Sequence, residues 1–268
     1  MSKPYPPNQY APPQSGNTGP TASGGLRYGE MYSHVFENPN WLANVLLAGV
    51  CLLIPIVGPI VVLGYRCEVI DHWNKYSQAT YPNFDFGRFS LYLSRGIWPF
   101  LVLFIGGFLA VPLVIATYAI GFLVFILATS FGPEGALVGT ILSFLVLFLG
   151  IILSMMLIGL VLVPMELKAG MQSDFAAGFD LTFIKGFIAL VWKETLVGFL
   201  FLYLANFALG LVGLLMFCVG IYFAIAIGVM AQTHFQHQLY LLYLRRGGTP
   251  VPPARTIPGP PTKAPSGW

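Results

Sequence analysis

The chain has 268 residues, of which 56% are hydrophobic and only 9% are charged, with a formal net charge of +3. A soluble domain carries about 25% charged residues, so this composition excludes an ordinary water-soluble fold and indicates a membrane protein. No basic cluster is present, so nucleic acid is not an expected partner. The three cysteines form no CxxC pair, and we expect neither a disulfide framework nor a thiolate metal site.

The two ends of the chain differ in composition from its middle. Residues 1–30 are rich in Pro, Gly, Asn, Gln, Ser and Thr, and residues 245–268 are rich in Pro. Such segments cannot bury enough apolar surface to fold, so we expect two disordered tails. No apolar stretch follows Lys3, which predicts no cleaved signal peptide. The segment 31–244 is the predicted transmembrane helical domain.

The first apolar run, residues 38–65, contains Pro55 and Pro59. Because proline breaks a helix, we predict a short helix over 41–54, a turn over 55–59 and a second helix over 60–76. The second helix becomes polar at Arg66 and is expected to emerge into water there. A single kinked span over 41–64 is the open alternative.

The next stretch approaches and then enters a long apolar run. In residues 81–95, Phe86, Phe89 and Leu93 recur at helical spacing, which suits either an amphipathic helix in the headgroup region or a connecting loop. Residues 96–133 carry no charge. We predict one span over 97–118, kinked at Pro112, followed by an interfacial or re-entrant piece that ends at residue 129.

The central run, residues 136–163, has 28 residues and no charge. As a helix it is about 42 Å long, against a hydrocarbon core of about 30 Å. Four small residues fall on one helical face and predict a helix-packing stripe: Gly139, Ser143, Gly150 and Ser154. The alternative is a lipid-facing span that happens to contain small residues.

The remainder is predicted as a polar loop and two spans. Residues 164–193 contain charged and aromatic side chains and are predicted as a second long amphipathic loop. Residues 195–244 are uncharged and long enough for two spans. Gly210, Gly213 and Gly220 mark the expected turn between them.

An internal repeat relates the two ends of the domain. Residues 42–59 match residues 204–221 at nine of 18 positions, including Leu42-Ala43-Asn44 against Leu204-Ala205-Asn206. Because 204–221 is predicted as a hairpin, 42–59 is predicted as one too. Both long loops and the C-terminal tail carry the Lys and Arg residues, which mark the cytoplasmic side.

These patterns predict an all-α, polytopic transmembrane helix bundle of about six membrane segments with a weak internal hairpin repeat. Both termini are expected on the cytoplasmic side of the cell's inner (plasma) membrane. The alternative topology has five spans and places the N-terminal tail outside.

Few side chains are candidates for chemistry. Asn44 and Asn206 are candidates for interhelical hydrogen bonds or substrate contacts. His234 and His237 share a helical face and could bind a metal with a third ligand such as Glu166, Asp71 or His72. A polar helix end at the cytoplasmic interface is the preferred interpretation of the two histidines. No catalytic motif is present, so we expect neither an enzyme nor a cofactor.

The segment NPNWLANVLLAGVCLLIPIVGPIVVLGY, the later FDF and the loop FAAGFD resemble the family of membrane proteins catalogued as DUF4013. The resemblance covers residues 36–244 and implies a multi-pass prokaryotic membrane domain, with no assigned activity, cofactor or catalytic residue. We therefore expect a non-enzymatic membrane scaffold or accessory protein. A permease or channel for a neutral or lipidic molecule is the alternative. The expected partners are the lipid bilayer and membrane or cytoplasmic proteins.

Overall fold

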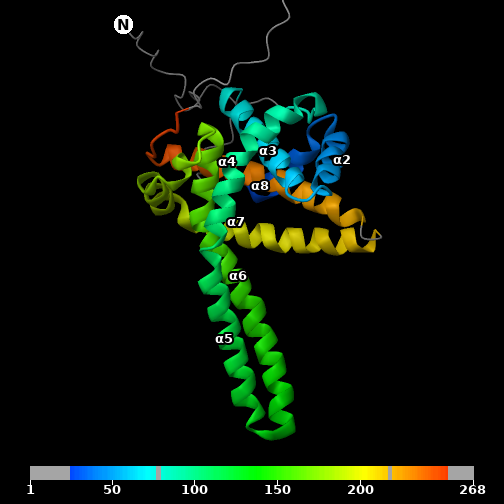
Figure 1. Ribbon diagram of the computed structural model, residues 1–268, viewed down its shortest axis with the longest axis vertical. Helices are drawn as coiled ribbons and strands as arrows, with labels where there is room; N and C mark the ends of the chain where they lie inside the picture. The colour runs from blue at the N-terminus through cyan, green and yellow to red at the C-terminus, as the bar shows by residue number, and fades with distance from the viewer. Residues whose placement is uncertain (1–24, 77–79, 217–218, 253–268) are drawn as a thin grey trace, which may run out of the picture.

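The computed structural model describes residues 25–76, 80–216 and 219–252, and this part of the chain is helical without any strand. Figure 1 shows a body of packed helices from which a long helical hairpin, α5 and α6, projects. The helices are α1 (Tyr28–Ser33), α2 (Trp41–Leu52), α3 (Val57–Lys75), α4 (Phe89–Gly107), α5 (Ala110–Thr129), α6 (Gly132–Gln172), α7 (Leu181–Leu215) and α8 (Val219–Arg245). Three short 3₁₀ turns connect them: η1 (His34–Phe36), η2 (Phe86–Arg88) and η3 (Ala176–Phe179).

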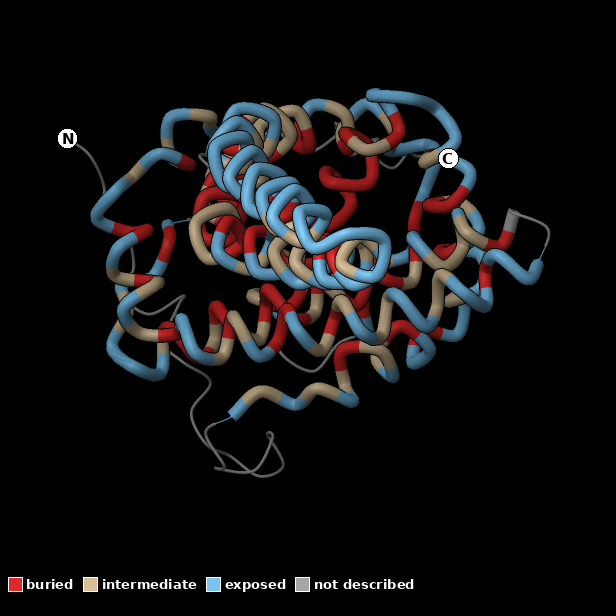
Figure 2. Tube along the Cα trace, turned by 90° about the horizontal axis from the view of Figure 1, so that it is seen from below, coloured by how far each residue is buried: buried red, intermediate tan, exposed pale blue. Residues whose placement is uncertain are grey.

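Burial divides the molecule in the same way. Seen from below in Figure 2, the projecting hairpin is mostly exposed, and the buried residues gather in the body. Most of the large side chains that the hairpin exposes are aliphatic or aromatic. An exposed apolar surface of this extent is typical of a site that contacts a membrane or another protein.

The body has three hydrophobic clusters that share helices. One joins α6, α7 and α8 around Phe187, Phe235 and Leu239. A second joins α2, α3, α4 and α8 around Tyr65 and Tyr92. A smaller third cluster lies where α4, α6 and α7 meet. The middle helix of this arrangement is α8, which contacts both of the larger clusters.

The turn between α2 and α3 confirms the predicted break at the prolines. The helix α2 ends at Leu52, and α3 begins at Val57, earlier than expected, because Pro59 is tolerated in the first turn of a helix. Ile56 has a positive φ of 64°, which is unusual for a β-branched residue. A Cβ atom at Gly58 would overlap the carbonyl oxygen of Cys51, so the turn requires glycine there.

The prediction for residues 81–129 was wrong in two respects. Phe89–Arg95 is the first part of α4 and not a separate amphipathic helix, and no interfacial or re-entrant piece follows residue 118. The break lies at Phe108 and Leu109. Pro112 explains it, because the proline ring clashes with the carbonyl four residues earlier and lacks the N–H that would bond it. Beyond the break, α5 continues as one helix to Thr129.

The predicted second loop, residues 164–193, was also wrong. The helix α6 continues through Pro164 to Gln172, and α7 begins at Leu181, so only residues 173–180 connect them. The side chain of Asp180 caps α7 by accepting hydrogen bonds from the N–H groups of Thr182 and Phe183. Two of the charged residues that suggested a loop, Glu166 and Lys168, lie on α6 and form ion pairs with Arg66 and Asp180.

Three described stretches are long and apolar enough to cross a membrane: Phe86–Thr129, Gly132–Gln172 and Leu181–Leu215. The fold is therefore an all-helical one with several helices suited to a membrane, and the expected count of six segments is not confirmed. In both views α7 extends sideways from the body, across the direction of the hairpin (Figures 1 and 2).

The described structure includes parts of both predicted tails. Tyr28 begins α1, and Leu26 and Tyr28 pack against the cluster around Phe235. At the other end the N–H of Val251 donates to the Tyr240 hydroxyl, 2.9 Å away, and Val251 is buried. Residues 1–24 and 253–268, the rest of the predicted tails, lie outside the described residues.

Within the described residues, which omit 217–218, each half of the proposed repeat contains the end of one helix and the start of the next. Residues 42–59 contain the end of α2, a turn and the start of α3, and residues 204–221 contain the end of α7 and the start of α8. The second helix begins at Val57 in the first copy and at Val219 in the second, which are aligned positions. The duplication itself stays a prediction.

Candidate functional site

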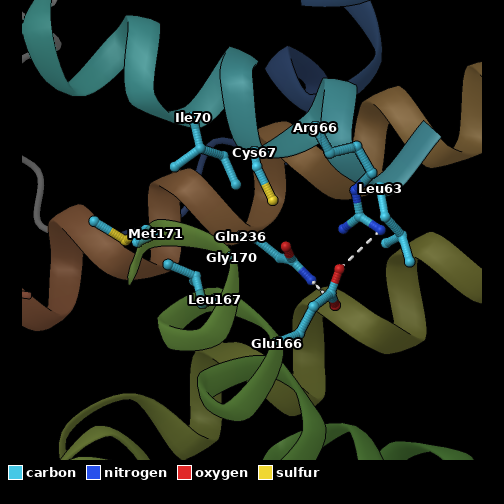
Figure 3. A pocket seen from close by; sticks show the side chains of 9 residues that line it. All are labelled: Leu63, Arg66, Cys67, Ile70, Glu166, Leu167, Gly170, Met171 and Gln236. Atoms are coloured by element: carbon cyan, nitrogen blue, oxygen red, sulfur yellow. Dashed lines mark hydrogen bonds and ion pairs between the residues drawn. The ribbon is translucent and has the colours of Figure 1, made fainter. Parts of the chain in front are cut away.

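The most deeply buried charges of the body lie together where α3, α6 and α8 meet (Figure 3). Arg66 Nη1 lies 3.0 Å from Glu166 Oε1, and the two side chains are only 7% and 8% exposed. Gln236 Nε2 donates to Glu166 Oε2 at 2.7 Å, and Arg66 Nε donates to Thr233 Oγ1 at 3.0 Å. One ion pair and two hydrogen bonds thus join three helices that are distant in the sequence.

A small cavity of about 10 Å³ adjoins this polar cluster. Arg66, Cys67, Glu166 and Gln236 line it together with apolar side chains, as Figure 3 shows. Arg66 Nη2 has no hydrogen-bond partner among the described residues. A cavity of this size holds one water molecule at most, so no organic substrate fits there.

The chemistry of this cluster suits a structural role, in which two buried charges stabilise each other. Burying one charge alone costs several kcal/mol, and the arginine and glutamate offset that cost for each other only while both are in place. Burial raises the pKa of the neighbouring Cys67 thiol to about 12, so the nucleophilic thiolate is not populated at neutral pH.

Further ion pairs surround the cluster on the same side of the molecule. Arg95 pairs with Asp71 and Arg88 with Glu68, which tie α4 and η2 to α3. Lys168 on α6 pairs with Asp180 at the start of α7. Together these contacts place several ion pairs in the body, whereas the charge nearest the hairpin tip is Glu134.

The two candidate metal ligands lie in an aromatic cluster. The His234 ring stacks on His34 with centroids 4.4 Å apart, and Trp73 contacts both His234 and His237. Burial lowers the pKa of His234 to about 3 and that of His237 to about 4, with the nearby His34 as a second cause. Both imidazoles are therefore neutral at physiological pH.

The proposed third ligands are engaged elsewhere. Glu166 is bonded to Arg66 and Gln236, and Asp71 is paired with Arg95. Within the described residues, no group of three or more His, Cys, Asp or Glu is arranged to hold a metal ion. His34, which the sequence analysis did not single out, is the residue that the fold places beside His234.

The two asparagines hold the N-terminal and interhelical segments in place. Asn44 is buried, accepts a hydrogen bond from the N–H of Phe84 at 2.9 Å and donates to Asn83 at 3.3 Å. Asn206 accepts from the Tyr32 hydroxyl at 3.0 Å. Each amide thus bonds a neighbouring segment of the same body, and neither lines the cavity beside Arg66 or the groove described next.

A separate apolar groove of about 370 Å³ lies between the start of α3 and the second half of α4. Its walls are mostly aliphatic and aromatic, and Arg66 contributes a polar part. The lining residues are Leu52, Pro59, Val62, Leu63, Arg66, Phe100, Leu103, Phe104 and Val229. The groove is large enough for part of a lipid or a small apolar molecule.

The small-residue stripe of α6 lies on the side that faces α5. Ser143 donates to the carbonyl of Gly121 at 2.9 Å, and Ser154 lies 3.3 Å from the hydroxyl of Thr117. A Cβ atom at Gly139 would overlap the side chain of Ala128, and one at Gly150 would crowd Thr117. The four small side chains let the backbones of α5 and α6 approach closely.

Sequence reasoning missed the central role of Arg66, Thr233 and Gln236. Arg66 was expected where its helix emerges into water, yet it is buried, as is Glu68. The sequence did contain one indication of the pair. Arg66 and Glu166 have opposite charges, and each is the first charged residue after a long apolar run. Nothing in the sequence indicates that α3 and α6 are neighbours.

Comparison with curated proteins finds no match. Comparison with solved structures finds none either. A family model does match: the one described as "Protein of unknown function (DUF4013)" matches residues 47–218. These residues include α3 to α7, the hairpin and the Arg66–Glu166 pair. The chain therefore belongs to the DUF4013 family of proteins of unknown function.

Proposed function

We propose that this protein is a non-enzymatic scaffold or accessory protein of the inner membrane, anchored by the α5–α6 hairpin and carrying its polar body on the cytoplasmic side. The observation that carries the proposal is the separation between an exposed apolar hairpin and a body that contains the ion pairs. A scaffold needs a firm anchor and a rigid body, and this arrangement supplies both.

The dimensions of the hairpin support its role as the anchor. The helix α5 has 20 residues. At 1.5 Å per residue it is about 30 Å long, which equals the thickness of the hydrocarbon core. The residues at the hairpin tip include no Lys or Arg, whereas the body is rich in them. By the positive-inside rule the tip lies outside the cell, and both tails lie in the cytoplasm.

The bonding of the polar side chains favours a scaffold over a transporter. Transporters keep unpaired or exchangeable polar groups along a pathway. Here Arg66, Glu166 and Gln236 bond to one another, and both candidate asparagines bond to neighbouring segments.

The test has two parts. In cells, an impermeant maleimide should label a Phe131→Cys variant from outside, because Phe131 is 82% exposed at the hairpin tip.

Purification in native-lipid particles should then recover a stoichiometric protein partner. Trp192→Ser should release that partner, because Trp192 is an exposed aromatic residue of the body, and such residues are typical of interfaces. Phe131→Ser should retain it. A preparation that contains only lipids would contradict the scaffold.

A permease or channel for a lipidic molecule is the second candidate, and the apolar groove between α3 and α4 favours it. It predicts flux or lipid exchange in proteoliposomes. Leu103→Trp should block that activity by filling the groove, and Asn206→Leu should abolish it if the substrate contacts this amide. Absence of any flux difference between the variants and the parent protein would exclude this function.

A further inference from the structure

We propose that the described parts of the two matched hairpins, residues 42–59 in the first and 204–216 and 219–221 in the second, insert into the cytoplasmic leaflet without crossing the bilayer. We call them the leaflet hairpins. Their partner is the acyl-chain region of that one leaflet. The inference rests on the proposed cytoplasmic placement of the body and deepens it.

The tips of the leaflet hairpins are the first observation. In the first tip Leu53, Ile54 and Ile56 are exposed, and Ile56 is 66% exposed. In the second tip Leu214, Leu215 and Met216 are exposed, and Leu215 is 82% exposed. Turns that face water are rich in Gly, Asn, Asp and Ser, and a tip made of large aliphatic side chains suits a hydrocarbon environment.

The exposed faces are the second observation. On α7 the exposed residues recur at steps of three and four, which is one helical face: Val197, Leu200, Leu204, Phe207, Leu211 and Leu214. The opposite face of α7 packs against α8, as the contact of Phe199 with Phe235 shows. The helix α2 likewise exposes Leu42, Leu46 and Val50 and buries its other side. Three aligned pairs are exposed in both copies: Leu42 and Leu204, Val50 and Val212, and Leu53 and Leu215. Val45 differs, because it is buried where the aligned Phe207 is exposed.

The direction of α7 is the third observation and decides between crossing and lying flat. Figure 1 shows α7 running across the hairpin and α8 on the side of α7 away from the hairpin tip. The exposed face of α7, opposite α8, therefore faces the side into which α5 and α6 extend. Two helices that run across each other cannot both cross one flat bilayer.

A close contact between α6 and α7 supports the crossing of the two helices. A Cβ atom at Gly159 would overlap the ring of Phe199, so the two helices meet closely at that point. The helix α2 has only 12 residues, about 18 Å, and is too short to cross in any direction.

The experiment measures depth along two helices of the full-length protein. Single cysteines replace Val197, Leu204 and Leu215 on α7, and Leu113, Ile120 and Leu127 on α5, in a background with the three native cysteines changed to alanine. Each carries an environment-sensitive fluorophore in phosphatidylethanolamine–phosphatidylglycerol vesicles that contain shallow or deep spin-labelled lipids. We expect all three α7 positions to be quenched at similar depth. On α5, Ile120 should be deepest.

The outcomes separate the two proposals. If Leu204 is deepest and Leu215 is labelled by an impermeant reagent from outside, α7 crosses and this inference fails. If the α7 positions are quenched by neither lipid, a protein surface such as a second copy covers them, and the inference also fails. The proposed orientation is tested independently by labelling at Phe131→Cys, which depends on α5 and α6 alone.

Discussion

At the scale of single residues, we expect loss of the buried Arg66–Glu166 ion pair to destabilise the fold more than loss of any other single contact. Arg66→Met leaves Glu166 as an unpaired buried charge, and Glu166→Met leaves Arg66 in the same state. We expect each single substitution to destabilise the fold by about 3–5 kcal/mol. The double substitution should cost less than either one, because no charge is left alone. Thermal unfolding in detergent measures all three variants.

The exposed pair of Arg27 and Glu30 is the matched control. Such surface pairs contribute about 0–1 kcal/mol, so Arg27→Met should change the unfolding temperature little. Equal losses for the single and double variants at Arg66 and Glu166 would show that the charges do not depend on each other.

The histidine cluster predicts a dependence of stability on pH. His234 and His237 have pKa values lowered to about 3 and about 4, below the value near 6.5 expected in the unfolded chain. Their contribution to stability is therefore complete above pH 6.5 and is lost as the pH falls from there towards 4. Below pH 6.5 the unfolded chain binds protons that the folded protein excludes.

The measurement is the unfolding temperature between pH 8 and pH 4. A variant with His234→Phe and His237→Phe retains the rings and loses the titration, so its stability should fall less steeply than that of the parent protein. A parent profile that is flat between pH 6.5 and 4.5 would contradict the buried neutral state.

At the scale of helices, the crossing of α3 and α4 is closer than side chains allow. A Cβ atom at Gly64 would overlap the carbonyl of Tyr92, and one at Gly96 would overlap the carbonyl of Ile60. Gly64→Ala should therefore separate the helices and destabilise the body by about 1–3 kcal/mol, as overpacking does. Gly210→Ala is the control, because nothing lies within 4 Å of its new Cβ atom.

In α7 the control substitution should be neutral or stabilising, since alanine favours a helix by about 1 kcal/mol over glycine. Unfolding temperatures compare the two variants directly. If Gly64→Ala is as stable as Gly210→Ala, the helices do not meet at this crossing.

The helices that the sequence predicted best are those bounded by local signals. Pro55 and Pro59 gave the position of the first turn, and the charge-free central run indicated α6. Its full length was missed, because Glu166 and Lys168 suggested a loop, while their ion-pair partners come from α3 and from the start of α7. A local sequence pattern indicates the chemistry of its own segment. It does not indicate which distant segment supplies the opposite charge.

The candidate site was less accessible to sequence reasoning than the fold. The four small residues of α6 were placed on one face by spacing alone, and the structure places α5 against that face. The polar cluster needed tertiary information, because Arg66 and Gln236 are 170 residues apart and share no motif. The groove beside α4 is lined by residues of four helices, α2, α3, α4 and α8, and no periodic pattern in any one of them indicates it.

At the scale of the whole molecule, charge sets the proposed orientation. Changing Ser130 and Glu134 to arginine would give the hairpin tip two positive charges, which oppose transfer across the membrane. We expect less protein in the membrane fraction and weaker labelling of the tip from outside. Glu134→Gln is the control and should insert normally, because it adds no positive charge. Unchanged insertion of the arginine variant would contradict the proposed orientation.

The helix α6 runs without a break from Gly132 at the tip to Gln172 in the body, and it meets Phe199 at Gly159. If that contact is taken as a fulcrum, the outer arm of α6 is about 40 Å long and its inner arm, to Glu166, about 10 Å, so a 4 Å displacement of the tip would move Glu166 by about 1 Å. We therefore expect a change in bilayer thickness to be felt, reduced about fourfold, at a carboxylate in the centre of the body.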